Sequence, residues 1–244
     1  ETLQTALEKV LRDTVAKDFD RILRLSQSSD PRERRFRAIA MGSLGFAPDG
    51  GEDRALEALI AGARSGDPDA VANASFSLGI LGHPRTPPGV LGQVIDDENM
   101  SDAVRRGAAW SLLQVQTSTI DHRAIVPTWL KQLRNYDTVD PGVLIQALRG
   151  TGRTRDKNHA DLVVPALRHP APLVRSAAAI ALGYLRKRET YKDLLPLIEP
   201  GEINPNVRLT AAKALQELAG GESRGYNVEQ WRKLFEVEQP NKSR

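Results

Sequence analysis

The sequence contains no cysteine, few aromatic residues and no long apolar run. Without cysteine, disulfides, thiolate nucleophiles and Cys-ligated zinc are excluded. No stretch approaches the roughly 18 apolar residues that a membrane-spanning helix needs, so we expect a soluble protein. The N-terminus shows no signal-peptide pattern. Because the chain begins at Glu1 rather than methionine, we expect a processed or trimmed product.

A strong charge imbalance is also absent. The 244 residues include 34 Lys and Arg against 31 Asp and Glu, a formal net charge of +3. That excess is too small to indicate a nucleic-acid binder by itself. Residues 149–192, however, carry ten basic and three acidic side chains, a local charge of +7, which leaves −4 for the rest. The sequence therefore predicts a local basic patch on a nearly neutral protein.

One helical element recurs six times along the chain, and its clearest copy spans residues 172–185. Aligning the copies places one residue before each helix, at intervals of 37, 34, 36, 34 and 33 residues: Asp30, Asp67, Ser101, Asp137, Ala171 and Asn204. All except the alanine can accept a hydrogen bond from the free N–H groups of a first helical turn. In four copies the next residue is proline, which is favoured at the first helical position. The alignment thus predicts six helix starts.

Two adjacent columns of this alignment indicate how the helices pack. One column is apolar and holds Met41, Leu78, Leu112, Leu148, Leu182 and Leu215; the column before it is small and holds Ala40, Ser77, Ser111, Ala147, Ala181 and Ala214. A large side chain beside a small one lets neighbouring helices approach closely. Glycine at 42, 79 and 183 needs a packing reason, because glycine costs about 1 kcal/mol relative to alanine inside a helix.

Shorter apolar stretches lie between these helices and are predicted to form the first helix of each pair. They span 19–25, 55–63, 88–95, 125–133, 162–167 and 194–198. Proline at 127, 165 and 196 is expected to bend three of them. Helix pairs repeating every 35 residues or so predict an all-α fold, an α-solenoid of about six pairs. We expect one domain over 1–244, with an N-terminal cap (1–16), repeats (17–219) and a C-terminal cap and tail (220–244).

The segment Pro-Leu-Val-Arg-Ser-Ala-Ala-Ala-Ile-Ala-Leu-Gly-Tyr-Leu at 172–185 resembles the second helix of HEAT repeats in the short form common in bacteria, which phycobilin lyases share. The copies at 205–218 and 102–115 are similar, and the resemblance covers about residues 17–219. It implies a right-handed superhelix whose second helices line the inner, concave wall. The copy at 137–152 departs from the pattern with Asp140-Pro141-Gly142. Residues 225–231 are similar to the ends of exported bacterial HEAT proteins, which favours an exported or periplasmic location.

Candidates for catalysis or metal binding are few. The four histidines, at 83, 122, 159 and 169, are dispersed, without the i, i+4 pairing of a metal motif. HEAT-like metal hydroxylases carry repeated His-Glu pairs, and this chain has none. We therefore predict no enzymatic activity, no cofactor and no metal. A lyase-like, cofactor-handling protein is kept as an alternative because of the shared repeat type.

The face predicted to bind a partner follows from helical geometry. At about 100° per residue, Ser176, Ile180 and Tyr184 lie opposite the buried face of their helix. The middle column of this face holds Ile39, Phe76, Trp110, Gln146, Ile180 and Lys213. Phe76 and Trp110, expected about 10 Å apart on adjacent helices, join Arg35 and Arg106 in a patch typical of binding hot spots. The predicted partner-binding residues are Arg35, Phe76, Arg106, Trp110, Gln146 and Tyr184; the alternative is that members of the column pack between repeats.

Seven basic residues form a second candidate surface: Arg149, Arg153, Arg155, Lys157, Arg186, Lys187 and Arg188. They occupy two loops one repeat apart, where they would hold an acidic partner or phosphates. Single arginines such as Arg175 and Arg208 are instead expected to pair with acids of a neighbouring repeat. The favoured function is a scaffold that binds a protein or peptide, and the alternative is binding of a nucleic-acid backbone.

Overall fold

The structure is a computed structural model that describes residues 2–118 and 123–237. Over these residues it contains α-helices and short 3-10 helices and no strand, as the sequence predicts. None of the helices described is long and apolar enough to cross a membrane. The chain divides into two compact units, Glu1–Ile125 and Val126–Arg244, which are described separately. The single domain and the limits of its caps stay predictions.

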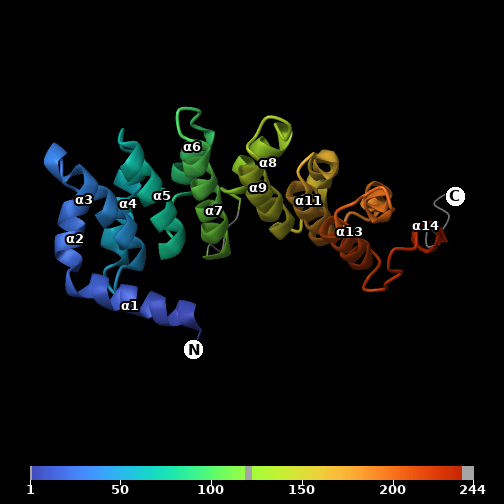
Figure 1. Ribbon diagram of the computed structural model, residues 1–244, viewed down its shortest axis with the longest axis horizontal. Helices are drawn as coiled ribbons and strands as arrows, with labels where there is room; N and C mark the ends of the chain where they lie inside the picture. The colour runs from blue at the N-terminus through green and yellow to red at the C-terminus, as the bar shows by residue number, and fades with distance from the viewer. Residues whose placement is uncertain (1, 119–122, 238–244) are drawn as a thin grey trace. The chain divides into compact units, whose positions relative to one another are not determined.

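Unit 1 begins with α1 (Leu3–Lys17), which is followed by helix pairs (Figure 1). The first helices of the pairs are α2 (Phe19–Ser26), α4 (Glu52–Ala63) and α6 (Pro88–Asp96), and the second helices are α3 (Arg34–Ser43), α5 (Pro68–Leu81) and α7 (Asp102–Ser118). Short 3-10 turns at Pro31–Glu33 and Leu44–Phe46 flank α3. The second helices pack side by side in chain order, so their outward faces form one surface.

Unit 2 repeats this arrangement. Its first helices are α8 (Val126–Arg134), α10 (Ala160–Val163) and α12 (Tyr191–Leu194), its second helices are α9 (Pro141–Arg153), α11 (Pro172–Leu185) and α13 (Pro205–Leu218), and α14 (Val228–Val237) follows. The 3-10 segments are Lys157–His159, Val164–Arg168, Arg188–Thr190 and Leu195–Ile198. On α14, Phe235 is buried and stacks on Tyr191 with 4.5 Å between ring centroids. The helix α14 therefore packs against α12, the first helix of the last pair.

Proline shortens two of the first helices in unit 2. The α-helical part of α10 ends at Val163 and that of α12 at Leu194, and each chain continues as a 3-10 segment that contains Pro165 or Pro196. Proline has no N–H to donate, and its ring clashes with the preceding turn. Pro127 is the second residue of α8, where an N–H is not required. Pro165 and Pro196 thus lie where an α-helix gives way to a 3-10 segment, whereas Pro127 lies in the first turn of α8 and not in a helix interior.

The packing columns are confirmed. The six residues of the large apolar column are at most 3% exposed, and those of the small column at most 4%. A Cβ atom added at Gly79 would lie 2.7 Å from the Ser111 Cα, and one at Gly183 would lie 3.2 Å from the Ala214 Cα. These glycines therefore let α5 contact α7, and α11 contact α13, almost backbone to backbone.

The predicted start of α9 is wrong. The helix begins at Pro141, and Asp140, rather than Asp137, accepts hydrogen bonds from the backbone N–H groups of Gly142 (2.9 Å) and Val143 (3.2 Å). The residue before a proline is sterically kept out of the helical region, so the helix cannot run through residue 140. Four other predicted caps are confirmed by side-chain hydrogen bonds: Asp30, Asp67, Ser101 and Asn204.

Candidate functional site

The outward faces of α3, α5 and α7 in unit 1 expose large apolar side chains. Ile39 is 66% exposed, Phe76 is 46% exposed and Trp110 is half-buried. The Phe76 and Trp110 rings stack with 4.8 Å between centroids and 25° between planes. The expected separation of 10 Å was wrong, because it describes the spacing of helix axes and these two side chains lean toward each other across a close α5–α7 contact. We call Ile39, Phe76 and Trp110 the aromatic patch.

Arginines on α3 differ in their surroundings. Arg34 and Arg37 both donate to the carboxylate of Asp67, the N-cap of α5. Burial raises the pKa of Asp67, but these hydrogen bonds outweigh it and hold the pKa below its ordinary value. Arg35, in contrast, is exposed and makes no ion pair with any residue that the structure describes; Arg106 is exposed on α7. The structure therefore places both predicted arginines at the surface of the helices that carry the aromatic patch.

In unit 2, the corresponding faces of α9 and α11 carry a different set of side chains. Gln146, Arg149 and Arg153 share one face of α9 by their spacing of three and four residues. Ile180 and Tyr184, on the adjacent helix α11, are 39% and 49% exposed. We call Gln146, Arg149, Arg153 and Tyr184 the arginine–tyrosine face. The predicted partner-binding residues thus divide between the units, with Gln146 and Tyr184 in unit 2.

Two features of the arginine–tyrosine face are unfavourable in the free protein. The Gln146 Oε1 atom is buried and has no hydrogen-bond partner, an arrangement that costs about 1–3 kcal/mol. Arg149 and Arg153 repel each other from positions i and i+4. Burial, and after it the positive charge of Arg149, lowers the pKa of Arg153, while Tyr184 acts in the opposite direction. The face thus collects positive charge beside an unsatisfied acceptor.

Comparison with known proteins identifies the repeat. Residues 126–216 match the family model of HEAT repeats. That segment, within unit 2, is therefore similar to HEAT repeats. No protein among the curated sequences matches it.

Solved structures similar to this chain include designed armadillo repeat proteins. A designed armadillo repeat protein is 15% identical, with a TM-score of 0.60 over 81% of this chain and 98% of that one. A second, in complex with the peptide (KR)4, is 14% identical, with a TM-score of 0.62 over the same shares. The complex of CpcE and CpcF of phycocyanin lyase from Nostoc sp. PCC7120 is 21% identical, with a TM-score of 0.52 over 88% of this chain and 92% of that one. At these identities the likenesses show the fold.

The basic patch predicted in these repeats does not remain one cationic surface. Lys187 pairs with Asp161 at 2.6 Å, and Arg186 pairs with Glu217 at 3.0 Å. The Arg188 guanidinium lies over the Phe235 ring, 4.9 Å from its centroid. Sequence spacing could not reveal these partners, because they lie 26 or more residues away along the chain. The remaining four members, Arg149, Arg153, Arg155 and Lys157, are exposed at the end of α9 and in the turn after it.

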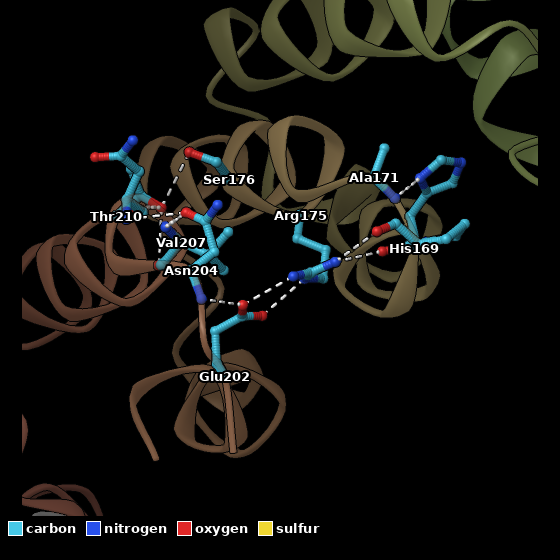
Figure 2. A network of polar contacts seen from close by, with 10 residues as sticks. His169, Ala171, Arg175, Ser176, Glu202, Asn204, Val207 and Thr210 are labelled. Atoms are coloured by element: carbon cyan, nitrogen blue, oxygen red, sulfur yellow. Dashed lines mark hydrogen bonds and ion pairs between the residues drawn. The ribbon is translucent and has the colours of Figure 1, made fainter. Parts of the chain in front are cut away.

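Arg175 has a structural role, as Figure 2 shows. Its Nε and Nη2 atoms donate to the two carboxylate oxygens of Glu202, both at 2.8 Å, and its Nη1 donates to the carbonyls of His169 and Pro170, both at 2.9 Å. The expected pairing with an acid of the next repeat is thus confirmed for Arg175. Arg208 instead lies over the Tyr226 ring and donates to the Ile198 carbonyl.

The histidines serve the fold wherever the structure describes them. His83 Nε2 lies 3.1 Å from Asp53, and His159 Nε2 lies 3.5 Å from Asp156. His169 is buried, and its Nδ1 accepts the backbone N–H of Ala171 (Figure 2). Residue 122 lies outside the described residues. Within residues 2–118 and 123–237, no three His, Cys, Asp or Glu side chains lie together as metal ligands would. The outward faces of the second helices instead present apolar side chains and guanidinium donors, which are suited to binding a partner.

Proposed function

We propose that this protein is a non-enzymatic binding module that holds a protein or peptide segment against the outward faces of its second helices. The aromatic patch is the principal contact in unit 1. The observation that carries this proposal is the stacked Phe76–Trp110 pair, which is left partly open to solvent while every residue of the large apolar column beneath it is buried.

The aromatic patch combines exposed apolar area with hydrogen-bond donors beside it. Stacked rings form a rigid surface that loses little conformational entropy when a partner covers it. Ile39 extends the apolar area on α3, and Arg35 and Arg106 supply guanidinium groups for carboxylates or carbonyls of the partner. Aromatic and arginine side chains together are the residue types that dominate binding energy in interfaces. We therefore expect a segment with one large apolar side chain next to an acidic or polar residue.

The similar designed armadillo protein, solved with the peptide (KR)4, supports a peptide as the partner class, since its fold accommodates one. The charge of the partner differs in our proposal. That peptide is basic, whereas the aromatic patch is flanked by arginines, so we expect a neutral or acidic segment here.

Tryptophan fluorescence tests the proposal directly. Trp110 is half-buried, whereas Trp129 and Trp231 are fully buried, so quenching by acrylamide reports mainly on Trp110. Peptides selected from a random library on the full chain should protect Trp110 from the quencher. Trp110→Ala should weaken the selected peptides by about 2 kcal/mol, roughly 30-fold in Kd.

Two further variants make the result interpretable. Ile39→Ser changes a side chain that is 66% exposed, so it should weaken binding without unfolding the protein. Leu7→Ala is the control, because Leu7 is a similarly exposed apolar residue (57%) that lies on α1 and not on a second helix. Selected peptides that bind Trp110→Ala and Ile39→Ser with unchanged affinity, or that are lost equally in Leu7→Ala, would show that the aromatic patch is not the contact.

A further inference from the structure

We propose that this protein associates head to tail with copies of itself, through helix α1 of one copy and helix α13 of the next. One contact surface, the α1 stripe, is formed by Leu3, Leu7, Val10 and Leu11. The other, the α13 side, is formed by Leu209, Ala212 and Gln216 of α13 and by Tyr226 in the loop before α14. This inference does not depend on the proposed function, because neither surface contains a residue of the aromatic patch.

The α1 stripe points away from the rest of unit 1. Leu3, Leu7 and Val10 are 87%, 57% and 60% exposed. The residues two positions after each of them lie on the opposite side of the helix, about 200° around its axis. Those residues line a pocket that α1 forms with residues 47–49; they are Thr5, Lys9 and Arg12. The helix thus turns its polar side inward and leaves its apolar side open to solvent.

The side of α13 that a further second helix would cover is also open. On α11, the residues 33 positions earlier contact α13: the Ser176 Oγ lies 3.2 Å from the Thr210 Oγ1 (Figure 2), and Ala179 is fully buried. At the corresponding positions of α13, Leu209 is 44% exposed and Ala212 is only partly buried. Because α14 packs against the first helix α12, it leaves this side of α13 accessible.

The two surfaces match in spacing when the helices are antiparallel. Positions 3, 7 and 10 of α1 are separated by four and then three residues, and positions 216, 212 and 209 of α13, read backwards, are separated by the same steps. In this register Val10 faces Leu209 and Leu7 faces Ala212. A large side chain against a small one lets two helices approach closely, as the second helices do within each unit.

The arginine beside Leu209 supports the same register. At the corresponding position of the preceding repeat, Arg175 pairs with Glu202 of the neighbouring repeat. Arg208 makes no ion pair with a residue that the structure describes, and its guanidinium lies over the Tyr226 ring, 4.8 Å from the centroid. In the antiparallel register, the exposed Asp13 of a second copy lies within one helical turn of Arg208, so it can supply the acid.

The net charges of the two units favour contact between unlike units. Residues 1–125 carry 15 Lys and Arg against 18 Asp and Glu, a net charge of −3, and residues 126–244 carry 19 against 13, a net charge of +6. Pairing α1 with α1, or α13 with α13, brings like charges together. Pairing α1 of one copy with α13 of another brings opposite charges together, so we assign the α1 stripe to the α13 side rather than to itself.

Sedimentation equilibrium of the full chain over a concentration series tests the association. Species larger than the monomer should form as the concentration rises. Leu7→Gln and Leu209→Gln each place a polar residue that helices tolerate at an exposed position, and each should weaken self-association about tenfold. The matched control is Leu173→Gln, at a leucine of α11 that is 71% exposed and lies outside both surfaces; it should change the Kd less than about twofold.

Mixing the two weakened variants separates a head-to-tail contact from a symmetric one. The Leu7→Gln variant keeps its α13 side and the Leu209→Gln variant keeps its α1 stripe, so the mixture should form one-to-one pairs with the affinity of the wild-type contact. Larger species should be confined to the wild type, because a head-to-tail contact leaves a free surface at each end. A mixture that associates no better than its components would contradict the proposal.

Disulfide trapping tests the register, since the native chain has no cysteine. Leu7→Cys mixed with Ala212→Cys should give disulfide-linked pairs on mild oxidation, because facing residues bring their Cβ atoms to the roughly 4 Å that a disulfide needs. Leu7→Cys mixed with Leu173→Cys should give none. Linked pairs from Leu7→Cys alone would show contact between two α1 helices and overturn the assignment.

Two further results would overturn the proposal: a chain that stays monomeric at every concentration, and self-association that Leu209→Gln leaves unchanged. Peptides selected for the aromatic patch should bind Leu209→Gln with an unchanged Kd. The loss of self-association and the loss of peptide binding are therefore separate outcomes, and either can fail without the other.

Discussion

Replacing Glu202 with glutamine tests how strongly the ion pair with Arg175 ties adjacent repeats together. The pair joins the first turn of α11 to the loop before α13, and its side chains are 15% (Arg175) and 7% (Glu202) exposed. Both nitrogen–oxygen distances are 2.8 Å, in the bidentate arrangement of strong guanidinium–carboxylate pairs. The Glu202→Gln variant keeps the shape of the side chain and removes its charge.

The expected loss follows from the partners that remain. Removing one member of a buried ion pair costs about 3–5 kcal/mol when the other is left unpaired. Here Arg175 keeps the carbonyls of His169 and Pro170, and glutamine keeps one oxygen that can accept. The loss is therefore closer to that of one charge-assisted hydrogen bond, about 2 kcal/mol in the free energy of unfolding. With a urea slope of about 2 kcal/mol per molar, the midpoint should fall by about 1 M.

The difference in the free energy of unfolding between wild type and Glu202→Gln should also depend on pH. The hydrogen bond from Arg175, and with it the N–H of Asn204, holds the pKa of Glu202 below its ordinary value of 4.5, against an opposing effect of burial. Because the folded-state pKa is the lower one, the carboxylate stabilises the fold fully above about pH 4.5, and this contribution is lost as the pH falls through the folded-state pKa. The gap between wild type and Glu202→Gln should therefore be full at pH 7 and narrow below pH 4.5.

The assay is urea unfolding followed by far-UV circular dichroism, at pH 7 and at steps from pH 5 down to pH 3. The control is Glu217→Gln, the same substitution in the same unit, in a pair whose side chains are 70% (Arg186) and 50% (Glu217) exposed. Solvent screens that pair, so its loss should stay within about 0.5 kcal/mol. Equal losses in the two variants, or a Glu202→Gln gap that does not change with pH, would refute the reasoning.

Two further substitutions test the packing and the start of α9, again by urea midpoints. Gly79→Ala places a Cβ atom 2.7 Å from the Ser111 backbone and should lower the free energy of unfolding by about 1–3 kcal/mol. Its control is Gly107→Ala, where the added Cβ has no atom within 4 Å and the free energy of unfolding should rise by up to about 1 kcal/mol. Similar effects of the two substitutions would contradict the close α5–α7 approach. Asp140→Ala removes the N-cap of α9 and should lower the free energy of unfolding by about 1 kcal/mol, whereas Asp137→Ala should leave it unchanged. A loss in Asp137→Ala and none in Asp140→Ala would show that the helix starts where the sequence alignment placed it.

Most of the fold was predictable because each repeat carries the same local signals. Proline after an N-capping residue marks a helix start, and the alternation of large and small columns marks the buried face, as at Leu182 and Ala181. These signals act over one or two helical turns, so they are visible in the sequence alone. The start of α9 was missed because the alignment was carried through Pro141 instead of ending the column there.

The candidate sites were only partly predictable. Helical periodicity places Phe76, Trp110, Gln146 and Tyr184 on outward faces, and the structure agrees that each is at least partly exposed. Helical periodicity does not predict that the Phe76 and Trp110 rings stack, because stacking depends on how far the two side chains lean across the contact between their helices. The basic patch was overestimated for a related reason, because a run such as Arg186-Lys187-Arg188 contains no information on acids that lie 26 or more residues away in the chain.

By itself, the sequence determined the helix pairs, their caps and the face that each second helix buries, because these depend on hydrogen bonds and periodicity within about ten residues. Only the tertiary structure decided which charges are neutralised, which rings meet and which amide oxygen lacks a donor. Those properties depend on distances between residues some 26 to 35 positions apart, such as Lys187 and Asp161 or Arg175 and Glu202. Stacking of successive repeats sets those distances.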